Sequence, residues 1–165
     1  MPPKLYNDGV IIDFSLENIS KLGIRIDSLV KLGDNTVLGK LVSISKGSVI
    51  GDGCNIKEVV IIGKNVHIGS NVIIGKCSVI EDGVIVGDNV VIHDFVFIAK
   101  NSVIGNNVFI GKESRIKGGN VKNKTVIPEK SIIAPSLFSP SNLSLKRGIK
   151  KEKRKDNSKK GENYG

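Results

Sequence analysis

The chain has 165 residues and a formal net charge of +9, and 39% of its residues are hydrophobic. This length is typical of one domain. Two cysteines and two histidines are too few for a disulfide framework or for a zinc site built from three histidines. No early apolar run is long enough for a signal peptide or a membrane span, so we expect a cytoplasmic protein.

The first predicted element is a short helix near the N-terminus. Ser15 has the residue type of an N-cap, Leu16, Ile19 and Leu22 share one apolar face, and Gly23 is a stop signal. Stacked repeats expose unpaired backbone at their ends and need caps. We therefore expect this helix to plug the first coil of the structure that follows.

After this helix an aliphatic residue recurs every six positions, a period that fits neither a helix nor a strand. The series is Ile26, Leu32, Leu38, Ile44, Ile50, Ile56, Ile62, Ile68, Ile74, Ile80, Val86, Ile92, Ile98, Ile104, Ile110 and Ile116. Val66 and Ile68 enclose one outward residue, His67, which is the pattern of a very short strand with alternating faces. Glycine or asparagine usually follows, so each hexad predicts a strand and a sharp bend.

Three bends close a triangle, and the corner residues sort into columns with a period of eighteen. One column reads Gly33, Gly51, Gly69, Gly87 and Gly105. Another contains neither glycine nor asparagine and reads Leu41, Val59, Cys77, Phe95 and Glu113. The three corners are therefore inequivalent, and the sequence predicts an all-β fold, a triangular parallel β-helix with 18 residues per coil.

This pattern resembles the hexapeptide-repeat family over residues 26–116 and again, after a slip of one residue, at Val121, Ile127 and Ile133. The resemblance implies that the β-helix is left-handed. The superfamily hosts many activities, so the fold alone does not give the function.

The chain divides into an N-terminal segment and cap (1–25), a left-handed β-helix (26–136) and a C-terminal tail (137–165). Residues 146–165 hold nine basic against three acidic side chains and almost no apolar ones. This composition predicts a disordered basic tail that contacts acidic partners, RNA or a membrane surface by salt-sensitive attraction. Aromatic residues make up only 4% of the chain, so we expect no specific nucleic-acid site.

Many members of the hexapeptide-repeat family are acyltransferases, in which a histidine is the general base for an acceptor that attacks an acyl-CoA thioester. His93 is the candidate for this role, because it occupies a corner column that is glycine at Gly75 and Gly111. The alternative interpretation is that His93 is a solvent-exposed corner residue without a catalytic role. The resemblance further implies acyl-CoA or acetyl-CoA as cosubstrate and a homotrimer with sites between subunits. Asp94 is expected to point away from His93, which makes a relay doubtful.

Two features favour a protein that is not an enzyme and has no cofactor. The register is unbroken over 26–116, so no loop is expected to wall a substrate cleft. The Gly-x-Pro-Ala-Lys ending of many acetyltransferases is replaced by Ile133, Ala134, Pro135 and Ser136. We also expect no metal site.

The predicted outward strand positions are apolar on all three faces, and exposed apolar stripes usually mark association. The residues expected to contact a protein partner are Ile61, Val79 and Phe97 on one face, Val49, His67, Ile85 and Val103 on the second, and Ile73, Val91 and Phe109 on the third.

The segments KLYNDGVIID and NKTVIPEKSIIAPSLFSPSN resemble the start and end of the dynactin subunit 5 family. That resemblance implies a non-catalytic scaffold that sits beside a second β-helix subunit at the pointed end of dynactin, in dynein-based transport. We take this scaffold as the first hypothesis and the acyltransferase as the second. A third is the regulatory β-helix of a sugar nucleotidyltransferase. The acceptor substrate, the oligomeric state and the interface face stay open.

Overall fold

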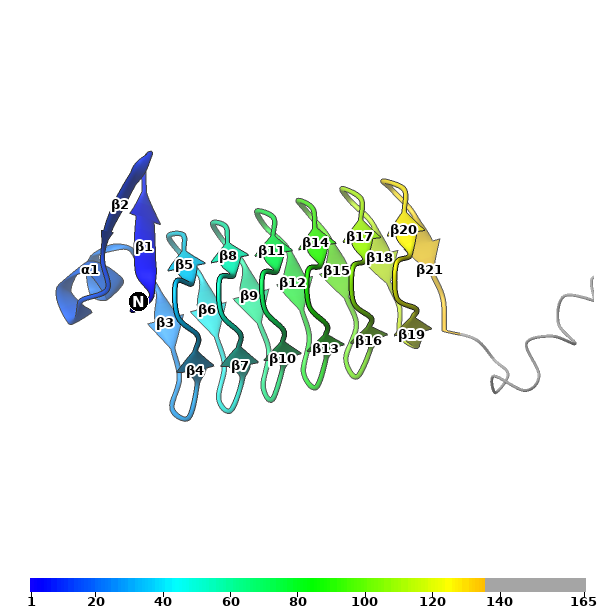
Figure 1. Ribbon diagram of the computed structural model, residues 1–165, viewed down its shortest axis with the longest axis horizontal. Coiled ribbons are helices and arrows are strands. Elements are labelled where there is room, and N and C mark those ends of the chain that lie inside the picture. The colour runs from blue at the N-terminus through cyan, green and yellow to red at the C-terminus, as the bar shows by residue number, and fades with distance from the viewer. Residues whose placement is uncertain (136–165) are drawn as a thin grey trace, which may run out of the picture. The chain divides into compact units, whose positions relative to one another are not determined.

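The computed structural model describes residues 1–135, and the expectations for the tail at 137–165 lie outside the described residues. Within the described range the chain forms a parallel β-helix with one short α-helix and a hairpin at its N-terminal end (Figure 1). This confirms the predicted fold class.

Three parallel sheets form the sides of the prism. Sheet A contains β5 (Val37–Leu38), β8 (Asn55–Ile56), β11 (Ile73–Ile74), β14 (Val91–Ile92), β17 (Phe109–Ile110) and β20 (Val126–Ile127). Sheet B contains β3 (Arg25–Ile26), β6 (Ser43–Ile44), β9 (Ile61–Ile62), β12 (Val79–Ile80), β15 (Phe97–Ile98), β18 (Arg115–Ile116) and β21 (Ile132–Ile133). Sheet C contains β4 (Lys31–Leu32), β7 (Val49–Ile50), β10 (His67–Ile68), β13 (Ile85–Val86), β16 (Val103–Ile104) and β19 (Asn120–Val121).

Neighbouring coils are in register at eighteen residues, as the columns predict. His67 pairs with Ile85 along sheet C, whereas Val103 pairs with Asn120, one residue early. This is the predicted slip. Gly118 and Gly119 precede it with φ of 130° and 85°, conformations that glycine adopts at least cost.

The predicted inward residues fill the interior. The hexad series is buried from Leu38 to Ile116, and only Ile26 and Leu32, at the open end, are partly exposed. Buried hydroxyls in the second inward series are satisfied, since Ser48 Oγ donates to the Gly63 carbonyl at 2.7 Å and Ser78 Oγ donates to the His93 carbonyl at 2.9 Å. Satisfied polar groups in a core cost little stability.

The corner from sheet A to sheet B, which we call the AB corner, has an unexpected backbone. Its column of Leu41, Val59, Cys77, Phe95 and Glu113 has φ between 58° and 63°, the left-handed region that β-branched and aromatic residues rarely adopt. The reason is the bonding between coils, because each of these N–H groups donates to a carbonyl of the preceding coil, as Phe95 does to Lys76 at 2.8 Å. The fold imposes on this column the conformation that glycine and asparagine adopt elsewhere.

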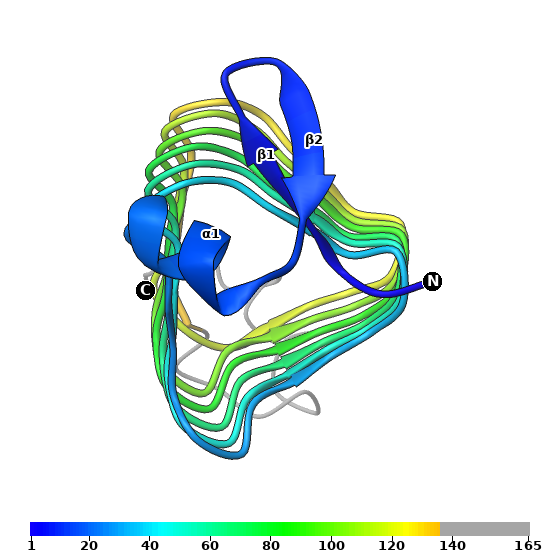
Figure 2. The same ribbon diagram turned by 90° about the vertical axis from the view of Figure 1, so that its left-hand side faces the viewer.

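The N-terminal segment contains a hairpin that the sequence analysis did not predict. Strands β1 (Lys4–Asn7) and β2 (Val10–Asp13) pair antiparallel, and β1 also pairs parallel with β5, so that it extends sheet A. Leu5 is fully buried and adds to the core. Figure 2, which looks along the prism, shows the hairpin standing above sheet A with its turn at one corner of the triangle.

Helix α1 (Leu16–Lys21) is close to the prediction. Ser15 is the N-cap and accepts a hydrogen bond from the Asn18 N–H at 3.2 Å, and Gly23 ends the helix with φ of 67°. Ile19 packs against the first coil. Leu16 was expected on the same apolar face but is 85% exposed. It lines, together with Ile19 and Ile26, a recess at the open end of the first coil.

Adjacent isoleucines in β11 test the division between core and surface. Ile74→Ala should lower the free energy of unfolding by about 2 to 5 kcal/mol, since it leaves a cavity in the stack. Ile73→Ala, at a position that is 40% exposed against 0% for Ile74, should cost about 1 kcal/mol or less. Denaturant unfolding of both variants measures the difference, and equal losses would contradict the assignment of faces.

Candidate functional site

His93 lies at the end of β14, on the sheet A side of the AB corner. Gly75, which occupies the same column in the preceding coil, is required by packing. A Cβ at this position would clash with the carbonyl carbon of His93. The backbones of adjacent coils approach too closely there for a side chain. Glycine at this position therefore does not by itself mark a space kept clear for the imidazole.

The His93 ring is held by one hydrogen bond and one aromatic contact. Its Nδ1 accepts from the Asp94 N–H at 2.8 Å, and the ring meets Phe109 of sheet A edge-on, with centroids 6.5 Å apart. A neutral imidazole that accepts at Nδ1 carries its proton on Nε2. In this conformation Nε2 is a hydrogen-bond donor. For the ring to accept a proton, its Nδ1 must break the hydrogen bond with the Asp94 N–H.

The Asp94 carboxylate has a structural role. Its Oδ1 accepts the Lys76 N–H from the preceding coil at 2.8 Å, a contact that aspartate or asparagine repeats at other corners, such as Asp82 with Lys64. His93 and Asp94 therefore do not form a relay.

A recess lies under the hairpin, between it and sheet A. Its volume is about 380 Å³, and its lining residues are Tyr6, Ile11, Val37, Gly39, Asn55, Ile56, Lys57, Glu58 and Lys76. The register of the coils is unbroken and no corner loop walls this recess, as expected. Its wall is the hairpin of the N-terminal segment, which the sequence analysis did not predict.

The hairpin is tied to the AB corner by an ion pair. Lys40 Nζ donates to Asp8 Oδ1 at 3.0 Å, and this hydrogen bond, together with the charge of Asp8, raises the pKa of Lys40 above its ordinary value of 10.5. The turn of the hairpin is thus fixed to the same edge of the prism that carries His93.

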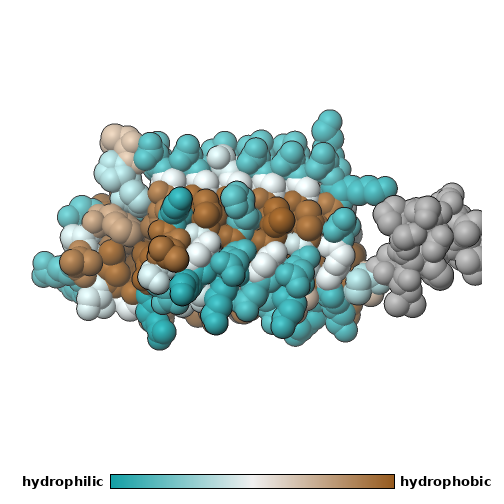
Figure 3. Space-filling model, turned by 90° about the horizontal axis from the view of Figure 1, so that it is seen from below, coloured by the Kyte–Doolittle hydropathy of each residue, from teal (hydrophilic) through white to brown (hydrophobic). Residues whose placement is uncertain are grey.

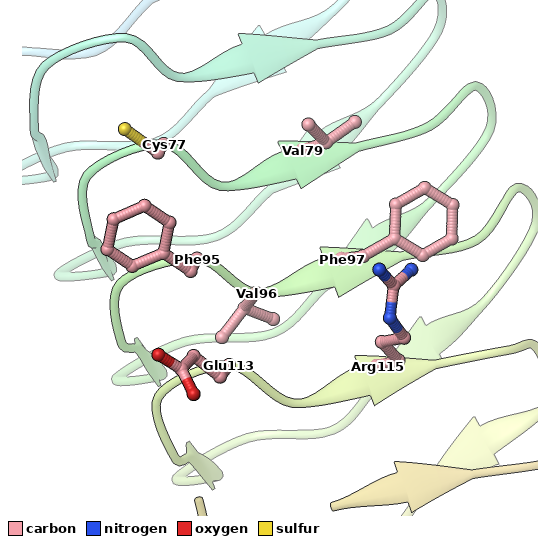
Figure 4. Close-up of a pocket in the computed structure, with 7 residues that line it drawn as sticks. All are labelled: Cys77, Val79, Phe95, Val96, Phe97, Glu113 and Arg115. Atoms are coloured by element: carbon pink, nitrogen blue, oxygen red, sulfur yellow. The ribbon is translucent and has the colours of Figure 1, made fainter. Parts of the chain in front are cut away.

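A shallow groove of about 420 Å³ runs along sheet B beside the AB corner (Figure 4). Cys77, Phe95 and Glu113 project from the corner on one side, and Val79, Phe97 and Arg115 project from the strands on the other. The Arg115 guanidinium lies over the Phe97 ring, 5.8 Å from its centroid. Sequence analysis named Val79 and Phe97 as outward positions but did not predict a groove. It also did not single out Arg115 or the corner residues, although the unusual corner column was visible as a pattern.

The outward strand residues lie on the surface, as predicted, on three separate faces. Ile61, Val79 and Phe97 belong to sheet B, Val49, His67, Ile85 and Val103 to sheet C, and Ile73, Val91 and Phe109 to sheet A. Figure 3 shows one side of the solenoid, where a hydrophobic band runs lengthwise and polar residues flank and interrupt it. His67 and His93 are not brought together, because sheet C lies opposite the AB corner. Whether these faces bind a partner stays a prediction.

Both cysteines are free, and Cys77 lies in the corner column that the sequence predicts. Cys54 is buried among the inward residues and Cys77 is exposed on the AB corner. Burial raises the pKa of the Cys54 thiol, which keeps it protonated and unreactive. Among residues 1–135, no three His, Cys, Asp or Glu side chains gather as a metal site. No helix in that range is long and apolar enough to cross a bilayer.

The model of a family described as "Bacterial transferase hexapeptide (six repeats)" matches residues 65–100 and 83–118. This match covers about a third of the chain, and the eighteen-residue coils of the structure agree with the resemblance to hexapeptide-repeat proteins. No protein of curated function matches the sequence.

Several solved structures are similar. LpxA from Acinetobacter baumannii is 16% identical, with a TM-score of 0.49 over 88% of this chain and 72% of that one. Serine acetyltransferase isoform 3 from Entamoeba histolytica, solved with cysteine, is 22% identical, with a TM-score of 0.42 over 82% of this chain and 45% of that one. The N-acyltransferase AntD from Bacillus cereus, solved with dTDP and coenzyme A, is 15% identical, with a TM-score of 0.42 over 84% and 97%.

The ion pair between Lys40 and Asp8 predicts how the pKa of Lys40 responds to a substitution. Asp8→Asn should lower the pKa of Lys40 toward 10.5, because both the charged hydrogen-bond acceptor and its negative charge are lost. An NMR titration of the Lys40 side chain measures this shift. Asp34→Asn, which changes a carboxylate that pairs with the N-terminal amine instead, is the control and should leave Lys40 unchanged.

Proposed function

We propose that this protein is an acyltransferase that moves an acyl group from acyl-CoA to a hydroxyl or amine acceptor, with His93 as its general base. The observation that carries the proposal is the combination, on one edge of the prism, of an exposed imidazole and a recess lined by lysines. Lys57 stands in the same corner column as His93 two coils earlier, about 10 Å away at ~4.8 Å per coil. The transferase name of the matching family supports the proposal.

Each group has a role in this reaction. Lys57 and Lys76 line the recess together with Glu58. Because Lys76 Nζ pairs with Glu58 Oε1 at 3.7 Å, Lys57 is the residue that offers positive charge to the phosphates of the CoA carrier. The acceptor O–H or N–H attacks the thioester carbonyl while its proton passes to the imidazole, and the tetrahedral intermediate then expels the CoA thiolate, which takes up a proton. For this step the His93 ring must turn away from the Asp94 N–H, so that an unprotonated nitrogen faces the acceptor.

Substitution of the imidazole tests this assignment. His93→Ala should lower acyl-CoA-dependent transfer about 10² to 10⁴-fold, the usual contribution of a general base, and should leave acetyl-CoA binding largely intact. Release of free CoA thiol, measured with a panel of hydroxyl and amine acceptors, gives the rate. His67→Ala, on the opposite sheet, is the matched control and should retain the wild-type rate. Equal rates in all three proteins would exclude His93 as the base.

A non-catalytic scaffold of the dynactin pointed-end kind is the second candidate. It is favoured by the apolar faces and by the shallow groove on sheet B, which fits a flat protein surface better than a small substrate. This function needs no cofactor and requires a stable complex with another β-helix subunit. A defined heteromer in native mass measurements, without any effect of acetyl-CoA, would favour the scaffold over the enzyme.

A further inference from the structure

Three aspartates of the chain are followed directly by a glycine, and their surroundings in the fold differ. These pairs are Asp8 with Gly9, Asp52 with Gly53, and Asp82 with Gly83. In such a pair the backbone nitrogen of the glycine can attack the carboxyl group of the preceding side chain, because glycine has no Cβ to hinder the approach. Whether this reaction takes place depends on whether the folded chain leaves both groups free.

The two pairs inside the β-helix are held by the preceding coil. Asp52 Oδ1 accepts the Asp34 N–H at 2.8 Å, and the Gly53 N–H donates to the Asp34 carbonyl at 2.8 Å. The pair at 82 and 83 repeats both contacts with Lys64, at 2.8 and 2.9 Å. The nitrogen and the carboxylate are engaged at the same time, so freeing them requires the stack of coils to open, which costs more than the opening of an exposed loop.

Asp8 and Gly9 form the two-residue turn of the hairpin, since Asn7 pairs with Val10. Their φ values of 47° and 88° are positive, as in the tight turns that join antiparallel strands. The Asp8 side chain is 74% exposed, and within residues 1–135 the Gly9 N–H donates no hydrogen bond. Of the three pairs, this one alone has a free nitrogen beside an exposed carboxyl group.

We propose that Asp8 is a site of spontaneous isomerisation, at which the chain converts to an isoaspartyl linkage and the hairpin turn loses its tie to the AB corner. The Gly9 nitrogen attacks the side-chain carbon of the protonated carboxyl group, and a C–N bond forms. The carboxyl OH leaves with the amide proton as water, which gives a cyclic imide. Water then adds to the α-carbonyl of the imide and breaks its bond to the Gly9 nitrogen, so the peptide bond runs through the former side chain and the overall composition is unchanged.

The ion pair with Lys40 slows the first of these steps. Lys40 Nζ donates to Asp8 Oδ1 at 3.0 Å, and a nearby opposite charge favours the ionised form of a carboxyl group. A carboxylate has no OH group to release as water, so the attack proceeds through the protonated fraction. Lys40 therefore sets how fast the site is modified.

Isomerisation changes the roof of the recess under the hairpin. The isoaspartyl linkage adds one carbon to the backbone of a turn that fits two residues, and it moves the carboxylate with which Lys40 pairs. Tyr6 and Ile11, which line the recess from the hairpin, then lie on strands whose turn is no longer fixed. The coils contain no modified residue and stay folded. The inference does not rest on the proposed function, because the reaction needs neither acyl-CoA nor His93.

Ageing of the purified protein at neutral pH tests the site. Isoaspartate should accumulate at Asp8 and stay absent from Asp52 and Asp82, as measured by enzymatic methylation of isoaspartyl groups and mapping of the labelled peptides. In denaturant all three sites should react at similar rates, because the coil contacts are lost. Gly9→Asn should reduce modification of Asp8 to background while the hairpin forms as before. Asparagine tolerates positive φ, and the nearest atom to a Cβ at Gly9 is the Tyr6 hydroxyl at 4.0 Å.

Removal of the lysine tests the protecting ion pair. Lys40→Gln should raise the rate at Asp8 about two- to fivefold, the effect of losing an exposed ion pair. Lys76→Gln is the matched control and should react like the wild type, because Lys76 occupies the same corner column but pairs with Glu58. In the modified fraction, hydrogen exchange of the β1 and β2 amides should be faster than in the unmodified protein.

Four results would overturn the inference. They are no isoaspartate at Asp8, equal amounts at Asp52 or Asp82 in the folded protein, a wild-type rate in Gly9→Asn, and equal rates in the two lysine variants. Unchanged hydrogen exchange in the modified fraction would contradict the loosening of the hairpin.

Discussion

The hydrogen-bond ladder between coils is the constraint on which the rest of the structure depends. Each coil donates to and accepts from its neighbours eighteen residues away, so every corner of the prism must repeat the backbone of the corner above it. Most corner positions therefore hold residues that readily adopt the required backbone angles. Others, such as Val59 with φ of 58°, are held in a conformation that their residue type disfavours. The stack of Ile and Val inside and the columns outside both follow from this repetition.

The sequence was sufficient to predict the coil length, the inward residues and even the slip after Ile116. Aliphatic residues recur every six positions and mark the strands, and the types of corner residue repeat every eighteen positions and mark the coils. It could not predict the hairpin at Asp8 and Gly9, since this element lies before the repeat and its position depends on the pairing of Leu5 with Leu38. For the same reason the recess under the hairpin was missed. A periodic pattern predicts what repeats, whereas the features that make one coil different from the next come from contacts outside the period.

The candidate site shows the same limit at the scale of single atoms. The position of His93 on a corner followed from its column, but the hydrogen bond of its Nδ1 with the Asp94 N–H and the use of the Asp94 carboxylate by Lys76 depend on side-chain conformation. These two contacts change the chemistry of the site, since one occupies Nδ1 of His93 and the other engages the Asp94 carboxylate with Lys76, so that the two side chains form no relay. Two surfaces share the AB corner: the lysine-lined recess faces sheet A, and the apolar groove faces sheet B.

The paired glycines at 118 and 119 have a consequence for how this chain tolerates insertions and deletions. In a strand, a change of one residue turns every later side chain to the opposite face, so nearly any length change within the coils would turn the interior outward. The seventeen-residue coil escapes this because two adjacent glycines can adopt backbone angles that other residues avoid. The loss of one residue is thus accommodated at a single corner, and the side chains of the later coils keep their inward and outward orientation.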